Sequence, residues 1–173
     1  MSVWKSLLLI STVVLFACSQ QVSSIKSSTH DSVSVNGGYL LLSVDSDVDL
    51  EELKVAGQKN FFLGAADLTA GNHYILIDLP AGHYQIESVK LNQRWQLHLK
   101  SGFWNFRVQH GQISYIGELQ LKGRIPELEN RASMALQYLE QHHAALLNNY
   151  QVRYSGPGED HYFEYVEGRG AAK

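Results

Sequence analysis

The sequence predicts a mainly β domain, an antiparallel β-sandwich with one long C-terminal amphipathic helix packed on it. Three observations predict this class. Apolar and polar residues alternate along much of the chain, turn residues recur about every eight to twelve positions, and a helical period replaces the alternation after Pro126. With 173 residues, 45% of them apolar, the chain is long enough for one domain with a substantial core.

The N-terminal segment has the three-part layout of a secretory signal. Lys5 supplies a positive charge, residues 7–16 form an apolar run, and the small Ala17 precedes Cys18, the one cysteine of the chain. A run of about ten apolar residues is too short to span a membrane, which takes roughly twenty. We therefore expect residues 1–17 to be a signal peptide. Ala17 would also fit the cleavage site of a soluble secreted protein, so that alternative stays open.

The sequence Leu15-Phe16-Ala17-Cys18 resembles a bacterial lipoprotein signal. The resemblance implies cleavage before Cys18, a diacylglyceryl group on its sulfur and acylation of the new amino terminus. Two or three acyl chains hold a protein stably on a bilayer, because each buried methylene contributes roughly 0.8 kcal/mol. The implied partner is thus a lipid membrane. Since Ser19 rather than aspartate follows the cysteine, the resemblance implies the outer membrane, on its periplasmic side.

Residues 18–36 are rich in serine and lack a periodic apolar pattern, which predicts a flexible tether. The folded domain is then expected over 37–167, followed by a disordered tail over 168–173.

Within the domain, alternation and β-branched or aromatic content predict a series of strands. They cover residues 39–44, 50–55, 60–63, 73–79, 83–89, 94–99, 103–108 and 113–121. The alternation places Trp95, Leu97 and Leu99 inward. It also places Ile113, Tyr115, Gly117, Leu119 and Leu121 on one face.

A different period begins at Pro126, where apolar residues recur at three- and four-residue steps as far as Tyr150. Pro126 fits a first helical turn, and Glu127 and Glu129 complement the positive end of a helix dipole. We expect one helix over 126–150 and a last short strand over 161–166.

Two stretches point to a fold family. Leu79-Pro80-Ala81-Gly82-His83-Tyr84 is followed by a strand that contains Gly111 and then Tyr115-Ile116-Gly117. This pattern resembles small bacterial lipoproteins with a prealbumin-like (carboxypeptidase-regulatory-like) β-sandwich. The resemblance implies a tight corner at Gly82, a core anchor at Tyr84, and a binding or structural module more than an enzyme.

Composition excludes some partners and cofactors. The chain has a formal charge of −3, and removal of Lys5 with the leader makes it −4, so no basic patch for nucleic acid is expected. No cysteine remains beyond Cys18 for a disulfide or a thiolate metal site. Neither a glycine-rich phosphate loop nor a nucleophile elbow occurs, so we predict no cofactor and no catalytic residue.

Acidic residues at alternate positions offer a weak cation site. Asp45, Asp47 and Asp49 resemble the start of a calcium loop, but Leu50 stands where glycine is required and Ala56 where glutamate is required. The competing interpretation is a solvated loop. His142 and His143 are adjacent on the expected helix and therefore point in different directions, which argues against a shared zinc ion.

An aromatic cluster is the best candidate ligand surface. It comprises Trp95, Phe103, Trp104 and Phe106. Rings at strand positions are usually core. Three aromatic residues within four positions, however, cannot all point to one side of a strand, so one ring could be presented outside the sandwich.

Together these observations predict a membrane-anchored periplasmic lipoprotein that acts as a non-enzymatic binding or structural module, with an envelope protein or a glycan as partner. The alternative is a small envelope hydrolase or ligand carrier that uses the acids of residues 45–52 near the aromatic cluster.

Overall fold

The structure is a computed structural model that describes residues 19–25, 34–100, 102–123 and 125–171. The expected signal peptide and the lipidation residue Cys18 lie outside this range. Strands account for 46% of the chain and helices for 20%, which confirms a mainly β fold. No helix in the described part is long and apolar enough to cross a membrane.

Six strands form the first sheet. Its order is β1 (Gln20–Val22), β4 (Phe61–Gly64), β3 (Glu52–Gly57), β6 (Gly82–Lys90) and β7 (Gln96–His98), and β8 (Asn105–Val108) also pairs with β6. All of these pairs are antiparallel except β1 with β4. The strands expected over 50–55 and 60–63 are confirmed as β3 and β4.

Five strands form the second sheet, which is mixed. Its order is β10 (Glu127–Glu129), β9 (Gln112–Gln120), β2 (Gly37–Ser46) and β5 (Gly71–Pro80), and β11 (Gln151–Tyr154) also pairs with β9. β9 runs parallel to both β2 and β11, so the prediction of a purely antiparallel sandwich is wrong. The reason is a change of sheet after β8: the Gly111 amide bonds to the Gly37 carbonyl at 3.0 Å, and β9 therefore starts beside the start of β2.

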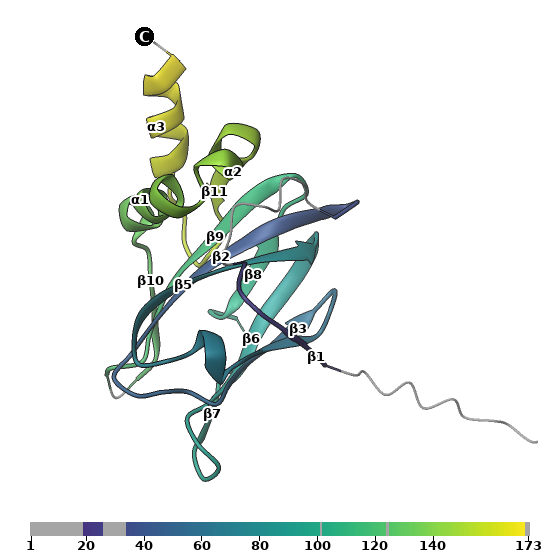
Figure 1. The fold of residues 1–173 in the computed structure, drawn as a ribbon, viewed down its shortest axis with the longest axis vertical. Coiled ribbons are helices and arrows are strands. Elements are labelled where there is room, and N and C mark those ends of the chain that lie inside the picture. Colours follow the sequence, from purple (N-terminus) through teal and green to yellow (C-terminus); the bar gives the residue numbers. More distant parts are fainter. Residues whose placement is uncertain (1–18, 26–33, 101, 124, 172–173) are drawn as a thin grey trace, which may run out of the picture.

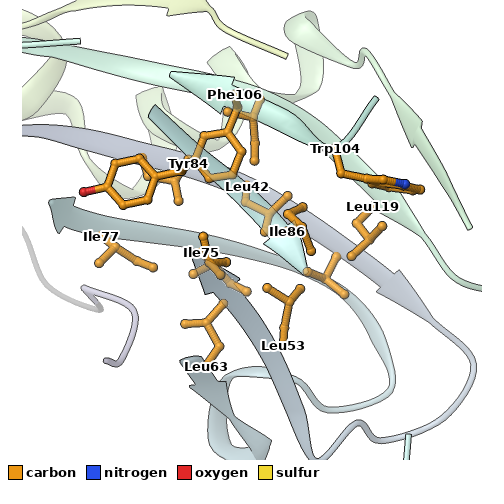
Figure 2. Close-up of a cluster of buried hydrophobic side chains, with 14 of the residues drawn as sticks. Leu42, Leu53, Leu63, Ile75, Ile77, Tyr84, Ile86, Trp104, Phe106 and Leu119 are labelled. Atoms are coloured by element: carbon orange, nitrogen blue, oxygen red, sulfur yellow. The ribbon is translucent and has the colours of Figure 1, made fainter. Parts of the chain in front are cut away.

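The two sheets enclose the larger core. Leu42, Ile75 and Leu119 from the second sheet meet Leu53 and Ile86 from the first (Figure 2). All ten residues of β2 are buried. This strand is covered on both faces, which explains why it is a continuous apolar run rather than an alternating one.

Helices cover the outer face of the second sheet and make a third layer (Figure 1). They are α1 (Ala132–His142), α2 (Ala144–Asn149) and α3 (Tyr162–Ala171). Their apolar residues, among them Ala135, Leu139 and Phe163, form a second core with Leu41 and Tyr115 of the sheet. A short 3-10 helix, η1 (Ala65–Asp67), follows β4.

The prediction of a single helix over 126–150 is wrong for the first residues of this range. Leu128 is buried, and it pairs opposite Leu119 while its two glutamate neighbours are more exposed, so this stretch has a strand period and forms β10. The Asn130 side chain then accepts a hydrogen bond from the Ala132 amide at 3.1 Å, and α1 begins there.

The same helix also breaks at His143, whose φ of −138° is not helical. An unbroken helix of 25 residues would be about 37 Å long, whereas a strand of nine residues extends about 30 Å. The break keeps the second helical segment over the sheet, where Tyr150 contacts Tyr39 with ring centroids 5.3 Å apart.

The prediction of a strand over 161–166 is also wrong, because this segment forms the first part of α3. Asp160 accepts a hydrogen bond from the Tyr162 amide at 2.7 Å, and Arg153 pairs with both Glu164 and Glu167. Two partners three residues apart lie on one face of a helix. The helix continues to Ala171, so the start of the expected disordered tail at 168 is helical.

A β-bulge at Gly117 changes which side chains of β9 share a face. The residues that were expected on one face therefore lie on two. The pairing with β2 shifts between Leu41 and Ser43, and Gly117 has a φ of +119°, which favours glycine. One extra residue reverses which side chains point inward. Tyr115 therefore faces the helices, whereas Leu119 faces the core between the sheets.

Residues 20–25, which were expected to belong to the tether, are instead docked on the domain. β1 pairs with β4, and the Ile25 amide bonds to the Leu76 carbonyl of β5 at 2.8 Å. We call residues 20–25 the strap. It joins an edge strand of the first sheet to an edge strand of the second, because partly buried Val22 and Ile25 have apolar surface to cover there.

Candidate functional site

The four residues of the predicted aromatic surface do not share one surface. Trp104 and Phe106 are buried in the core between the sheets, and Phe106 stacks on Tyr84 with centroids 5.7 Å apart (Figure 2). Trp95 is 69% exposed and Phe103 is 52% exposed. Trp95 was expected to point inward, but it precedes the short edge strand β7, where no further strand of the sheet covers it.

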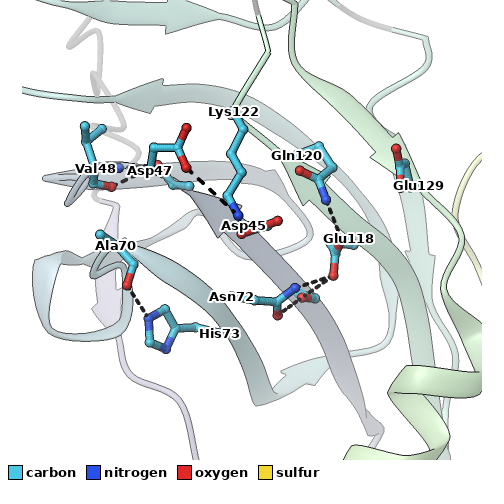
Figure 3. Close-up of polar contacts among 12 residues, drawn as sticks. Asp45, Asp47, Val48, Ala70, Asn72, His73, Glu118, Gln120, Lys122 and Glu129 are labelled. Carbon is cyan, nitrogen blue, oxygen red and sulfur yellow. Dashed lines mark hydrogen bonds and ion pairs between the residues drawn. The ribbon is translucent and has the colours of Figure 1, made fainter.

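The three aspartates of the candidate cation site have protein partners, and Figure 3 shows Asp45 and Asp47 beside Lys122. The Lys122 ammonium lies 2.7 Å from Asp45 and 4.0 Å from Asp47, and the hydrogen bond that Lys122 donates to Asp45 raises the pKa of Lys122. Asp49 accepts a hydrogen bond from the Ala70 amide at 2.8 Å. A lysine thus occupies the place of a cation beside Asp45. Nowhere in the described ranges are three His, Cys, Asp or Glu residues grouped to hold a metal.

The structure separates Asp45, one of the acids of residues 45–52, from the buried members of the aromatic cluster. Asp45 lies on the outer face of the second sheet, whereas Trp104 lies in the core on the other face. Glu51 is engaged by Lys90 at 2.8 Å. Glu52 pairs opposite Lys90, and Lys90 pairs opposite Gln96, the neighbour of Trp95, so the hydrolase or carrier alternative stays a prediction for these residues only.

A buried carboxylate that was not singled out in the sequence organises the outer face of the second sheet. Glu118 is 1% exposed and receives hydrogen bonds from Gln120 at 2.6 Å, from Ser43 at 3.2 Å and from Asn72 (Figure 3). Arg131, at the start of α1, adds an ion pair at 2.9 Å. These partners satisfy both oxygens, so Glu118 fastens the helix layer to the sheet and is not poised for proton transfer.

A shallow recess of about 460 Å³ lies beside Arg131. Its lining includes Gln120, Glu127 and Glu129, and Glu129 bonds to Arg131 at 2.7 Å. Because two carboxylates already neutralise Arg131, the recess presents no free positive charge from this residue.

A second hollow, which we call the strap cavity, brings together four separate elements. It measures about 280 Å³ and lies between the strap, η1, β5 and the C-terminal end of α1. Its lining residues are Ser24, Ile25, Ala66, Asp67, His73, Tyr74, Ile75, Tyr138, His142 and His143.

His143 is the more deeply buried of two buried polar residues, His143 and Asp67, in the described lining of the strap cavity. It is 1% exposed, and burial, with a smaller contribution from the charge of His142, lowers its pKa below the usual 6.5. One ring nitrogen, Nε2, lies 3.2 Å from the Tyr138 hydroxyl, while Nδ1 has no hydrogen-bond partner. A buried nitrogen without a partner is uncommon.

Two tyrosines form the flat wall of the strap cavity. The rings of Tyr74 and Tyr138 stack with centroids 4.5 Å apart and an angle of 14° between their planes. Burial raises the pKa of both phenols, so both remain uncharged at neutral pH. Ring faces and hydroxyl groups in one wall suit a ligand with both apolar and polar edges.

Among the residues that the structure describes, no lysine or arginine lines the strap cavity, and the one charged carboxyl group in this lining belongs to Asp67. Asp67 is buried and accepts a hydrogen bond from the Ser24 amide at 3.2 Å. The Ser24 hydroxyl accepts a bond from the Leu76 amide at 3.1 Å, and Nε2 of His73 contacts Thr69 and Ala70. These polar groups are held in the fold, and the arrangement supports binding of an uncharged molecule.

Sequence reasoning located parts of this site without assembling it. His143 was considered as a possible metal ligand beside His142, and the structure buries it at the break between α1 and α2. Tyr74 lies in an expected strand and Tyr138 in an expected helix, but no pattern in the sequence places them against each other. One feature of the sequence could have indicated Glu118: it is an acidic residue within a strand that is otherwise mostly apolar.

The comparisons with known proteins found no match among family models, curated proteins or solved structures.

Proposed function

We propose that the chain is a lipid-anchored, non-enzymatic binding module of a bacterial cell envelope. The observation on which this proposal depends is Leu15-Phe16-Ala17-Cys18 after Lys5 and an apolar run. Acyl chains on Cys18 would hold the domain at the membrane. Ser19 after the cysteine favours the outer membrane and its periplasmic side.

We also propose that the two packed sheets correspond to the prealbumin-like sandwich. Two details support the roles that this resemblance implies. A side chain at Gly82 would come within 2.8 Å of the Gln58 Cβ, so the corner requires glycine. Tyr84 is buried between the sheets, where it acts as a core anchor. The parallel strand pairs and the helical layer are additions to the simple sandwich.

The strap cavity is the proposed ligand site, and an uncharged sugar unit of an envelope glycan is the proposed ligand class. Tyrosine, histidine and serine groups line the cavity, and none of its described lining residues is a lysine or an arginine. Sugars present hydroxyl groups and an apolar ring face, which match the polar groups and the two stacked tyrosines of the lining. A volume near 280 Å³ is enough for one such unit.

The anchor is tested by comparing wild type with Cys18→Ser. The wild-type protein should sediment with membranes and incorporate labelled palmitate, and the variant should do neither. A wild-type protein that is unlabelled and soluble would refute the anchor.

The ligand site is tested by titrating the mature domain with neutral monosaccharides, N-acetylglucosamine among them. Changes in the amide NMR chemical shifts are measured during the titration. Shifts should concentrate at His73, Tyr74 and His143. Ala66→Leu fills the exposed rim of the cavity and should abolish them, whereas the neighbouring exposed Ala65→Leu should not. Shifts that survive Ala66→Leu, or no shifts at millimolar sugar, would refute the site.

A further inference from the structure

The chain enters the folded domain at one particular end of the sandwich. Gln20, the first residue of β1, pairs opposite Phe61, and its amide bonds to the Asn60 carbonyl at 3.2 Å. The same end holds the start of β2 and the end of β5, since Gly37 pairs opposite Pro80 (Figure 1). We call this the entry end. Its turns are residues 57–60, 80–83 and 108–112.

The strap leaves little free chain between the domain and Cys18. From Gln20 onward the backbone is held by β4, and further along the Ser24 amide bonds to Asp67 and the Ile25 amide to Leu76. Only Ser19 separates Cys18 from β1. Two residues span at most about 7 Å even when fully extended. A lipid on Cys18 would therefore hold the entry end close to the bilayer surface.

Charged side chains are distributed unevenly between the two ends. Lys59, His83, Arg107 and His110 belong to the entry end, where Arg107 pairs opposite His83. Asp78 near the same end already accepts hydrogen bonds from the amide and hydroxyl of Ser34. The opposite end, where β2 finishes at Ser46 and β3 begins, contains the acids Asp47, Asp49, Glu51 and Glu52 together with Lys90 and Lys122, which pair with Glu51 and with Asp45 and Asp47.

We propose that the entry end lies against the membrane and that Lys59 and Arg107 contact anionic phospholipid headgroups. This inference rests on the proposed anchor at Cys18. Two basic side chains bind an anionic surface weakly by themselves. The anchor makes their contact intramolecular, so weak attraction is enough to orient the domain. The opposite end then points away from the bilayer because the anchor and these contacts hold the entry end against it.

The orientation is tested with a benzophenone amino acid in place of Gln58 at the entry end or Val48 at the opposite end, both of which are exposed. Each lipidated protein is placed in vesicles of phosphatidylethanolamine with phosphatidylglycerol and irradiated. Position 58 should crosslink to lipid at least fivefold more than position 48. Equal crosslinking, or more at position 48, would overturn the proposal.

The charge requirement is tested with Lys59→Glu combined with Arg107→Glu. Lipid crosslinking at position 58 should fall to the level found in vesicles of phosphatidylcholine alone. Arg94→Glu combined with Lys100→Glu makes the same change of charge at exposed sites away from the entry end, and it should leave crosslinking unchanged. A fall that is equal in both double variants would contradict a contact specific to Lys59 and Arg107.

Failure of this inference can be told apart from failure of the anchor. The mature chain, whose one cysteine is Cys18, can be coupled through its sulfur to a maleimide phospholipid in the same vesicles. This attachment holds the domain at the bilayer whether or not the natural protein is acylated. Equal crosslinking at positions 58 and 48 in the coupled protein would refute the orientation alone, while absence of natural acylation would refute the anchor alone.

Discussion

The amide nitrogen of Ile25 lies 2.8 Å from the carbonyl oxygen of Leu76, which fastens the start of the domain to the edge of the second sheet. A few residues earlier, β1 pairs with the edge strand β4 of the first sheet. The strap thus bridges both sheets and also forms a wall of the strap cavity. Any lipid attached just before the strap would be coupled mechanically to the domain and to its proposed ligand site.

Ile25→Ala should weaken the strap. The side chain is partly buried in the second core, so we expect the free energy of unfolding to fall by about 1–2 kcal/mol. Urea unfolding measures this change, and limited proteolysis should show faster cleavage within residues 20–25. Val35→Ala removes a side chain that is 94% exposed and serves as the control. Equal stability of the two variants would show that the strap is not docked.

Glu118→Gln should loosen the helix layer from the sheet. The substitution keeps the shape but removes the charge that Arg131 pairs with, and it places an amide donor where other groups already donate. We expect a loss of about 1–3 kcal/mol in the free energy of unfolding. Glu129→Gln changes the exposed partner of the same arginine and should cost less than about 1 kcal/mol. A larger effect at Glu129 would contradict the role assigned to Glu118.

Burial of His143 should make stability depend on pH. Its folded pKa lies below 6.5, so at lower pH the unfolded chain takes up a proton that the folded chain does not. This contribution to stability is complete above pH 6.5 and is lost as pH falls from 6.5 toward the folded pKa. Urea unfolding between pH 7.5 and 5.5 should show a smaller decrease for His143→Gln than for wild type. The exposed His161→Gln variant should follow the wild-type curve; a parallel change in both variants would contradict the prediction.

The two tryptophans of the aromatic cluster should behave differently. Trp104 is buried among Ile86 and Leu119, so Trp104→Ala should lower the free energy of unfolding by about 3–4 kcal/mol. Trp95 is mostly exposed, and Trp95→Ala should change stability by less than about 1 kcal/mol. Chemical denaturation distinguishes them. Similar losses for both would place Trp95 in the core, as its alternation pattern suggested.

The alternation of apolar and polar residues predicted most strands, because a strand that buries one face has an apolar residue at every second position. The strands near residues 39–44, 73–79 and 83–89 are confirmed as β2, β5 and β6. Short segments were harder. Residues 127–129 have charges that suit a helix start, yet pairing with β9 buries Leu128 and makes them a strand. Here a tertiary contact overrides a local preference.

Relationships between distant segments could not be predicted from one sequence. The bulge at Gly117 reverses the faces of β9, and alternation alone does not reveal an added residue. The serine-rich composition of the strap suggested flexibility, whereas its docking depends on Leu76 and Asp67, about fifty and forty residues away. The strap cavity depends on the same long-range pairing, and for that reason its residues were not grouped in advance.

Intact mass spectrometry of the mature protein purified from membranes tests the central claim most directly. The account predicts a polypeptide that begins at Cys18 and has the added mass of a diacylglyceryl group and an amide-linked acyl chain. A mature chain that begins at another residue, or that begins at Cys18 without lipid, would contradict it.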